Sequence, residues 1–384
     1  MRIMHILSDS NIGGAGILLE SLLRHTGAPK EDICVLLPRG AAMAPRYRAV
    51  GVQVSELLSV PDRSYAMEDL PAVMGEIRRF HPDVVHTHAS LTGRLAAYLT
   101  GVPVRVATRH CAYPVGRAGR PWRRLLHRAG DALLSTCTVA TAHAAVKNLR
   151  ELGIPEKRIV MIRNGAEALP PMPSEKRRAR RAALGIGEGC FCLGMAARLV
   201  PVKGQDLLLR AAARLLAAGE DIHVLLVGEG EARGELTRLA EELCIRERVS
   251  FAGFAEKIGE FTPLFDAAVN CSRGTETSCL ALSEAMSLGI PVIASDYGGN
   301  PEMVREGENG LLFPAEDAGA LAAAILRLAH DRALYCRLSE GARRRFLAEL
   351  DARRMAAEYD LLYRRLCEEK GVFAPKWGRA YKKL

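Results

Sequence analysis

Short apolar runs alternate along the chain with longer stretches in which apolar residues recur every three or four positions. The runs have the length of a buried strand, and the longer stretches have the spacing of one helix face. Strands that alternate with helices in this way are typical of a parallel sheet covered on both faces. The runs predict strands at 3–7, 33–37, 83–88, 104–108, 133–140, 159–162, 192–196, 222–227, 249–251, 265–271 and 292–294.

The alternation is interrupted at 166–181, where several prolines precede a run of lysine and arginine. Prolines and a charge run are typical of a linker, but for the charges themselves a solvated helix face is the favoured interpretation. A chain of 384 residues exceeds the usual size of a single hydrophobic core. We therefore expect an α/β protein of two Rossmann-like, doubly wound parallel-sheet domains, 1–168 and 169–354.

The segment from Ser272 to Glu284 combines an apolar run before it, two carboxylates and a helical pattern at its end. We expect a strand, a loop that holds Glu276, and a helix capped by Ser278, with the free N–H groups of 279–281 at the positive end of its dipole. Helical side chains lean toward the N-terminus, so Glu284 should face the helix end that Glu276 borders. Anion donors flanked by two carboxylates suit a sugar attached to a phosphate.

Two carboxylates could instead form the acid–base pair of a glycoside hydrolase, which places them across the scissile bond. Because both would border one helix end, recognition of hydroxyl groups is the favoured interpretation. Arg198 and Lys203 lie five residues apart between a strand and a helix, where two cations could neutralise a diphosphate. A glycine-rich turn with Gly13, Gly14 and Gly16 follows the first strand and could contact a phosphate or an acceptor.

The sequence has only weak signatures of a dinucleotide cofactor or a metal ion. Gly228-x-Gly230 follows a strand, but an arginine occupies position 233 and the dinucleotide-binding pattern fails. His86 and His88 could be metal ligands, although two histidines at a strand end are more often structural or substrate-facing. The sequence has no Asp-x-Asp motif for a metal-chelated diphosphate. We therefore expect no metal and no cofactor.

Composition and charge limit the partners. The chain is 49% hydrophobic and 25% charged, with a formal net charge of +9, which is globular and favours an anionic partner. Aromatic residues make up 5% and no interleaved basic–aromatic motif occurs, so we expect no nucleic acid. Ten scattered cysteines without Cys-x-x-Cys spacing, and the lack of any apolar run of signal-peptide or membrane-spanning length, favour a cytoplasmic protein.

A dense series of motifs continues through the chain. The second half carries Ala197-Arg-Leu-x-x-x-Lys-Gly, Val227-Gly-x-Gly, Val249-x-Phe-x-Gly-Phe, two glutamates separated by seven residues before Ala-Met, Gly289-x-Pro-Val-Ile-Ala, Gly298-Gly-x-x-Glu and Gly307-x-Asn-Gly. The first half carries the Gly-Gly-x-Gly turn, His86-Thr-His, Thr108-x-His and Asn164-Gly. Over nearly the whole chain these motifs resemble those of the retaining GT-B glycosyltransferases of the GT4 family. The resemblance implies two domains that face each other across a cleft, with a final helical segment, about 355–384, that crosses back onto the first domain.

The resemblance also implies roles for single residues at the donor phosphates. Arg198 and Lys203 would hold the donor diphosphate. The backbone amides of Ser278, Cys279 and Leu280 would assist them. The usual proposal for the family is attack from the front face, in which the leaving diphosphate accepts the proton, so that no protein base is needed and the anomeric configuration is retained.

The sugar and nucleoside contacts follow in the same way. The resemblance implies that Glu284 binds the ribose hydroxyls and that Glu276 binds hydroxyls of the transferred sugar. Gly253 and Phe254 would lie near the base. His110 would sit at the reacting sugar, where it contacts a hydroxyl group or the developing positive centre.

Four positions, in three motifs, depart from the family's usual residues. Thr277 and Ser278 follow the first glutamate, where the family often has Gly-Phe, and Ala197 replaces a frequent glycine. Cys111 follows His110, where an aspartate is frequent. The first two departures concern the identity of the donor sugar, and the third concerns the detailed role of the histidine.

We therefore expect a retaining glycosyltransferase that moves a hexose or N-acetylhexosamine from a nucleotide diphosphate sugar, with UDP favoured, to an envelope-glycan or lipid-linked acceptor. The arginine-rich segment Arg117–Arg128 contains Trp122, Leu125 and Leu126, which could insert into an anionic membrane surface on its inner, cytoplasmic face. The alternative is a solvated helix with Trp122 packed inward. Two other functions stay open, a sugar-nucleotide epimerase and a sugar-nucleotide-binding protein without transfer.

Overall fold

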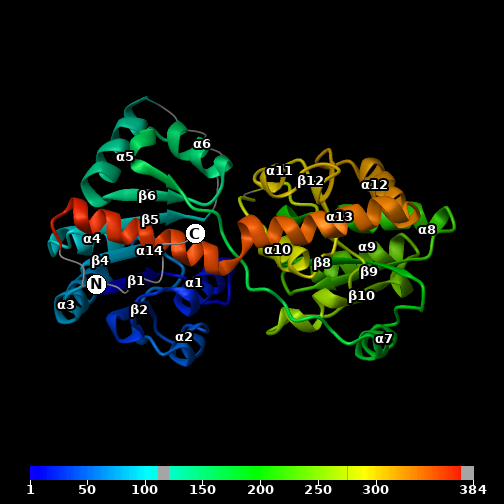
Figure 1. Ribbon diagram of the computed structural model, residues 1–384, viewed down its shortest axis with the longest axis horizontal. Coiled ribbons are helices and arrows are strands. Elements are labelled where there is room, and N and C mark those ends of the chain that lie inside the picture. The colour runs from blue at the N-terminus through cyan, green and yellow to red at the C-terminus, as the bar shows by residue number, and fades with distance from the viewer. Residues whose placement is uncertain (111–120, 275, 373–384) are drawn as a thin grey trace. The chain divides into compact units, whose positions relative to one another are not determined.

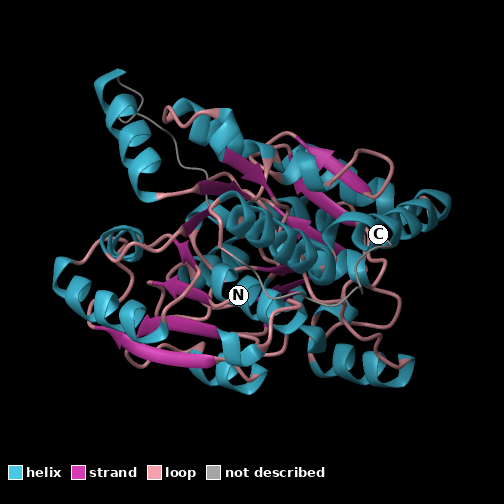
Figure 2. Cartoon of the chain, turned by 60° about the vertical axis from the view of Figure 1, so that its left-hand side comes forward, coloured by secondary structure: helices cyan, strands magenta, loops and turns pink. Residues whose placement is uncertain are grey.

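The computed structural model describes residues 1–110, 121–274 and 276–372. The chain forms two compact units, and the last helix belongs to the first of them (Figure 1). The first unit comprises Met1–Gly165 and the chain from Ala352 onward, and the second comprises Ala166–Asp351. Each unit has a parallel sheet, and Figure 2 shows the strands lying between helices.

The sheet of the first unit has seven strands in the order β3-β2-β1-β4-β5-β6-β7, with all its neighbours parallel. The strands are β1 Ile3–Leu7, β2 Ile33–Pro38, β3 Gln53–Leu58, β4 Val84–His88, β5 Val104–Arg109, β6 Cys137–Ala140 and β7 Ile159–Met161. The helices are α1 Gly14–His25, α2 Ala44–Val50, α3 Leu70–Phe80, α4 Leu91–Leu99, α5 Pro121–Leu134, α6 His143–Glu151 and α14 Ala352–Glu369. The helix α14 packs along α1 and β5, as its position across the strands in Figure 1 shows.

The sheet of the second unit has six strands in the order β10-β9-β8-β11-β12-β13, again parallel throughout. The strands are β8 Phe191–Ala196, β9 Ile222–Val227, β10 Val249–Phe251, β11 Ala267–Asn270, β12 Val292–Ser295 and β13 Gly310–Phe313. The helices are α7 Ser174–Ala183, α8 Gln205–Ala217, α9 Arg233–Glu242, α10 Leu280–Ser287, α11 Asn300–Met303, α12 Ala318–His330 and α13 Arg332–Arg345. Two apolar clusters, one on each face of this sheet, form its core.

Strand order places one switch point in each sheet. In the first unit the chain builds β1, β2 and β3 outward in one direction, then returns and places β4 on the other side of β1. In the second unit β11 returns to the free side of β8 in the same way. Loops that leave neighbouring strands in opposite directions open a crevice at their carboxyl ends, where ligands bind in doubly wound sheets. The segments after β8 and β11 meet at such a point.

One local prediction is wrong and another is confirmed. The apolar run 133–140 is not one strand, because α5 extends through Leu134 and β6 begins only at Cys137. The prolines at 166–181 lie outside regular structure, and the charge run that follows them forms α7, which confirms the favoured interpretation of these charges as a helix face. Arg177 and Arg181 on this helix both pair with Asp266, so the charge run is a helix face and not a flexible linker.

Candidate functional site

The loop after β8 carries Lys203 to the edge of the loop after β11. It ends in a short turn at Pro201–Lys203, and Gly204 adopts a positive φ of 74° before α8 begins. A Cβ atom on Gly204 would lie 2.3 Å from the carbonyl oxygen of Cys271, so only glycine allows this close approach. The two loops are therefore in direct backbone contact below the side chains that they present.

Lys203 and Glu276 form an ion pair, with Lys203 Nζ 2.7 Å from Glu276 Oε2. The same carboxylate oxygen accepts a hydrogen bond of 2.8 Å from Ser272 Oγ and one of 3.4 Å from Asn270 Nδ2. Glu276 is 6% exposed, and burial alone would raise its pKa. The charge of Lys203 and these hydrogen bonds outweigh burial and hold the pKa of Glu276 below its usual value.

The pKa of Lys203 also depends on two opposing effects, its burial and the charge of Glu276. Burial lowers it, but the attraction of Glu276 prevails and the pKa of Lys203 is raised. Both groups are thus charged over the neutral range, as a closed pair in the structure without ligand. The positive charge of Arg198 acts against this shift, as a like charge does.

Two consecutive glycines hold the loop that carries Glu276. Gly299 donates its N–H to the carbonyl oxygen of Glu276 at 3.1 Å. Cβ atoms at Gly298 and Gly299 would lie 2.3 Å and 1.8 Å from the carbonyl oxygens of Glu276 and Thr277. The backbone after β12 is therefore pressed against this loop, and the position of the carboxylate is set from both sides.

The helix α10 begins later than its sequence predicts. Its N-cap is Cys279 and not Ser278, and no side chain caps it. The N–H of Cys279 donates to the sulfur of Met303 at 3.1 Å, so this amide is not free as expected. A thioether is a weak acceptor, and an oxygen of a phosphate would be a stronger partner for the same N–H.

Glu284 lies in the fifth position of α10, just beyond its first turn. It is half-buried, and its carboxyl group has no hydrogen-bond or ion-pair partner among the described residues. Burial raises the pKa of Glu284 to about 7. A carboxylate that lacks partners near the start of a helix is suited to accept hydrogen bonds from hydroxyl groups.

The remaining predicted residues of the second unit follow neighbouring strands of the same sheet. Arg198 is exposed, and among the described residues its guanidinium has no hydrogen-bond or ion-pair partner. Gly253 follows β10 with a φ of 75° and accepts a hydrogen bond from Gly228 N–H at 2.8 Å. Phe254 beside it is exposed, which leaves an aromatic face open to a flat ligand.

In the first unit the glycine-rich turn leads directly into α1. Gly13 is the N-cap, and a Cβ atom there would meet nothing within 4 Å. Gly16 is instead a packing position, since Tyr47 Oη donates to its carbonyl oxygen at 3.0 Å and a Cβ atom would meet Met43 at 3.0 Å. Gly14 is the first residue of the helix, so the open backbone for a ligand is at Gly13 and Gly14.

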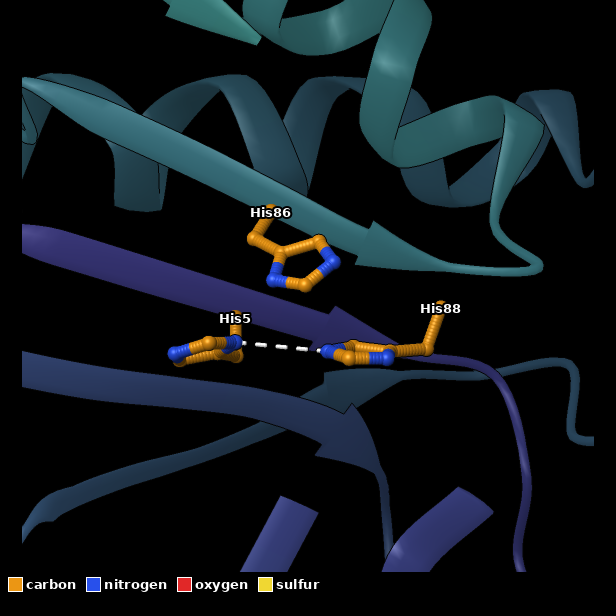
Figure 3. A group of neighbouring side chains, drawn as sticks. All are labelled: His5, His86 and His88. Carbon is orange, nitrogen blue, oxygen red and sulfur yellow. Dashed lines mark hydrogen bonds between the residues drawn. The ribbon is translucent and has the colours of Figure 1, made fainter. Parts of the chain in front are cut away.

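Four histidines gather at the carboxyl end of the first sheet. His5 Nδ1 lies 3.3 Å from His88 Nε2, the contact drawn in Figure 3, and His88 Nδ1 lies 3.0 Å from His110 Nε2. His86 instead contacts the hydroxyl groups of Tyr363 and Thr108, each at 2.6 Å. Burial lowers the pKa of His5 to about 3 and that of His110 to about 4.

Three of these histidines could hold a metal ion by their spacing. One ring nitrogen from each of His5, His86 and His88 lies within 4.8 Å of the other two. However, both ring nitrogens of His86 and of His88 already have hydrogen-bond partners in the structure. The expectation of no metal stays a prediction.

The surface of α5 is apolar and basic. The exposed fractions are 55% for Trp122, 65% for Leu125 and 62% for Leu126, so the interpretation with Trp122 packed inward is wrong. The other end of α5 is fixed, because Asp131 is buried and pairs with Arg158 at 3.0 Å. Positions 117–120 of the arginine-rich segment, and Cys111, lie outside the described residues. No helix in the described part of the chain combines the length and apolar character needed to cross a membrane.

Several polar residues at these sites were not predicted. Asn270 and Ser272 support Glu276, and their signal in the sequence is a pair of polar residues where the buried strand β11 ends. His5 is a lone polar residue within the apolar run of β1, and its partners come from β4, far away in the sequence. Tyr363 is on α14, and nothing in the helical pattern indicates that it faces His86.

Comparison with known proteins identifies the class. The model of glycosyl transferases group 1 matches residues 176–345, and that of glycosyltransferase family 4 matches residues 12–168. A D-inositol 3-phosphate glycosyltransferase of Geodermatophilus obscurus is 31% identical over 80% of this chain and 73% of the relative. An N-acetyl-alpha-D-glucosaminyl L-malate synthase of Bacillus anthracis is 25% identical over 77% of this chain and 78% of the relative.

Solved structures agree in fold. A crystal structure of Anabaena Alr3699/HepE in complex with UDP has a TM-score of 0.83 and 20% identity, and covers 95% of this chain and 100% of that one. The same Anabaena protein in complex with UDP-glucose has a TM-score of 0.81 over 96% of this chain and 100% of that one, at 21% identity. The chain therefore belongs to the group 1 glycosyltransferases of family GT4, with the GT-B fold. It is a glycosyltransferase.

Proposed function

We propose that the enzyme transfers a hexose or N-acetylhexosamine from a UDP-sugar with retention of the anomeric configuration, and that the donor binds at the carboxyl edge of the second sheet. The observation that carries this proposal is the Lys203–Glu276 ion pair. Exposed Arg198 precedes Lys203 in the segment after β8, and half-buried Glu284 lies on α10, the helix that follows Glu276. This arrangement offers cations for a diphosphate and carboxylates for hydroxyl groups. The Anabaena protein of similar fold, whose structures contain UDP and UDP-glucose, supports a uridine nucleotide.

Donor binding would open the ion pair. Lys203 and Arg198 would bind the diphosphate, while Glu276 would accept hydrogen bonds from hydroxyls of the transferred sugar. The negative charge that develops on the leaving diphosphate would then meet two cations and the start of α10. The basic group for the acceptor proton would be this diphosphate, which agrees with the low pKa of Glu276 as a poor proton acceptor.

We assign Glu284 to the ribose hydroxyls, and Gly253 and Phe254 to the neighbourhood of the base. The amides of Ser278, Cys279 and Leu280 assist the phosphates. We assign His110 to a contact with the transferred sugar, as the family resemblance implies. The neutral state of His110, kept by burial, suits a hydrogen bond with a sugar hydroxyl and gives no positive charge next to a developing oxocarbenium centre.

A screen of nucleotide sugars by thermal shift tests the donor. A ligand of the folded state raises the unfolding temperature by mass action, and we expect UDP-sugars to exceed GDP- and ADP-sugars. Slow hydrolysis of the best donor, with the released sugar's anomer read by NMR, then tests retention. Lys203→Ala should abolish this hydrolysis. Tight binding of a donor with no hydrolysis and no transfer would instead favour a binding protein without catalysis.

The acceptor that we propose is lipid-linked or part of an envelope glycan, presented at an anionic membrane surface that α5 contacts. Trp122, Leu125 and Leu126 are exposed on this helix, within a few residues of three arginines, Arg123, Arg124 and Arg128. An apolar face bordered by arginines is suited to the interface of an anionic bilayer, where each arginine near the surface is worth about 1 kcal/mol. Neutral vesicles should therefore bind far less protein than anionic vesicles.

Flotation with phosphatidylglycerol-containing vesicles tests this contact. We expect binding at low salt, its loss at high salt, and its loss when Trp122 and Leu125 are both replaced by serine. Leu361→Ser is the matched control, because Leu361 is 61% exposed on α14. No flotation at low salt would sink the membrane proposal.

A small soluble acceptor is the second candidate, and the names of the relatives favour it. Inositol 3-phosphate and L-malate both carry negative charge, and the glycine turn at Gly13 and Gly14 leaves open backbone at the start of α1 for an anion. An assay with polyol phosphates and hydroxy acids in the absence of membranes separates the two. Transfer to such an acceptor at a rate that vesicles do not change would favour the soluble acceptor.

A further inference from the structure

A chain of hydrogen-bonded imidazoles leads from the interior of the first unit to His110. His5 on β1 contacts His88 at the end of β4, and His88 contacts His110, the residue after β5. These three strands are neighbours in the sheet, so the chain crosses it at the switch point. His5 and His88 are 2% and 5% exposed, which leaves water little access to either contact. Figure 3 shows a ring nitrogen of His5 and one of His88 pointing toward each other along their hydrogen bond.

All three rings are neutral. Burial lowers the pKa of His5 to about 3 and of His110 to about 4, and it lowers the pKa of His88 well below the ordinary value. A neutral imidazole has one N–H donor and one acceptor nitrogen. A ring with neighbours on both sides must therefore donate to one and accept from the other.

This requirement leaves two possible arrangements of the ring protons in the three histidines. Each contact joins Nδ1 of one ring to Nε2 of the next. If Nδ1 of His5 carries the proton, then Nδ1 of His88 and Nδ1 of His110 must carry theirs. If Nε2 of His110 carries the proton, the other two rings must also be protonated on Nε2. The three histidines therefore share one tautomer.

His86 is not part of this chain. Its ring nitrogens contact the hydroxyl groups of Tyr363 and Thr108, which can each donate or accept. Its tautomer is therefore independent of that of His110. His86 packs against His88, with ring centroids 4.2 Å apart, but its ring nitrogens form their hydrogen bonds with Tyr363 and Thr108.

We propose that His88, held by His5, is a positioning residue that fixes His110 in one tautomer and one ring orientation. For catalysis this rests on the proposed contact between His110 and the transferred sugar. The wrong tautomer would present an N–H group where the sugar needs an acceptor, or the reverse, and would replace a hydrogen bond by a repulsion. The hydrogen-bonded histidines fix the tautomer of His110 before the donor binds.

The wild-type protein supplies the first test. In protein labelled with ¹⁵N at histidine and treated with a chelator, two-bond NMR correlations report which ring nitrogen carries the proton. We expect His5, His88 and His110 to have the same tautomer. A mixed set contradicts the proposal. Zinc held by His5 Nδ1 and His88 Nε2 would give such a mixed set, because the two rings would be protonated on opposite nitrogens.

Two variants of His88 supply the second test. The amide of His88→Asn overlies Nδ1 and keeps a partner for His110, but it can either donate or accept. The amide of His88→Gln overlies Nε2, so it keeps the contact with His5 and loses that with His110. We expect His110 to show both tautomers in the asparagine variant and a changed ring orientation in the glutamine variant. His86→Gln is the matched control and should leave the His110 signals unchanged.

Kinetics separate this proposal from the proposed function. We expect kcat for hydrolysis of the best donor to fall at least tenfold in His88→Gln, with KM for that donor within twofold of wild type. In His88→Asn we expect kcat to recover in part. Unchanged His110 signals in both His88 variants would overturn the tautomer chain. Altered signals with unchanged kcat would confirm the chain and contradict instead the proposed contact of His110 with the sugar.

Discussion

Replacing Glu284 by glutamine should stabilise the second unit at alkaline pH and weaken its binding of the donor. The carboxyl group is half-buried without a partner among the described residues, and burial raises its pKa from 4.5 to about 7. Because the folded-state pKa exceeds the unfolded value, the folded state binds the proton more tightly. The resulting contribution to stability is complete below about pH 4.5 and is lost as pH rises through about 7.

The size of the effect follows from the shift. A rise from 4.5 to about 7 corresponds to at most about 3 kcal/mol between the protonated and the ionised forms. Glutamine has nearly the same shape and no charge, so Glu284→Gln should gain about 1–3 kcal/mol at pH 8 and almost nothing at pH 4.5. For a unit of this size each kcal/mol raises the unfolding temperature by about 2–4 °C.

Thermal unfolding without nucleotide, at pH 4.5 and pH 8, measures this difference, and calorimetric titration with UDP measures the binding. A hydrogen bond to a charged group is worth about 1.5–3 kcal/mol, so the loss of the carboxylate should weaken binding about 10- to 100-fold. Glu241→Gln on α9, an exposed position, is the control for loss of one negative charge. A variant that is less stable than wild type at pH 8 would refute the reasoning, because it would show that the carboxylate has a partner.

Other predictions concern the loop around the ion pair. Lys203→Ala leaves Glu276 buried without its ion-pair partner and should lower the free energy of unfolding by about 3–5 kcal/mol. The double variant Lys203→Ala/Glu276→Ala should recover much of this loss. Denaturant titration measures both. Glu276→Ala should lower kcat more than it weakens donor binding, and Glu284→Ala the reverse, so equal loss of turnover with unchanged affinity in both would contradict this division. Gly299→Ala should displace the loop, because its Cβ atom would lie 1.8 Å from the carbonyl oxygen of Thr277, and UDP affinity should fall at least tenfold. Gly234→Ala within α9, where a Cβ atom meets nothing within 4 Å, should keep the affinity and raise stability by about 0.5–1 kcal/mol.

The alternation of apolar runs and helical stretches predicts the fold because a parallel sheet buries its strands on both faces. Strands such as β1, β8 and β9 are short and almost wholly apolar, so they are visible without tertiary information. The run at 133–140 is misleading because its first two residues, Leu133 and Leu134, belong to the end of the exposed helix α5. These two leucines are apolar, but they are not part of a buried strand. β3, α2 and α3 were not predicted. β3 lies at the edge of its sheet and is only partly buried.

The site is less predictable than the fold, because its contacts join loops that are distant in the sequence. The sequence indicates that Lys203 and Glu276 both serve the donor, but not that they pair with each other over 2.7 Å. The start of α10 is one residue later than the capping preference of Ser278 suggests, because the backbone of this loop is held by Gly298 and Gly299. The hydrogen bonds of His88 with His5 and His110 depend on the order of the strands, which local patterns do not contain.

We propose that the carboxyl edge of the second sheet binds the diphosphate of a nucleotide sugar through Arg198 and Lys203. Calorimetric titration of UDP into wild type, Arg198→Ala and Lys203→Ala tests it most directly, with Arg210→Ala on α8 as a control for loss of an exposed arginine. We predict saturable binding of UDP to wild type and to the control, and a loss of affinity of at least tenfold in each of the other two variants. Equal affinity of all four proteins for UDP would contradict the account.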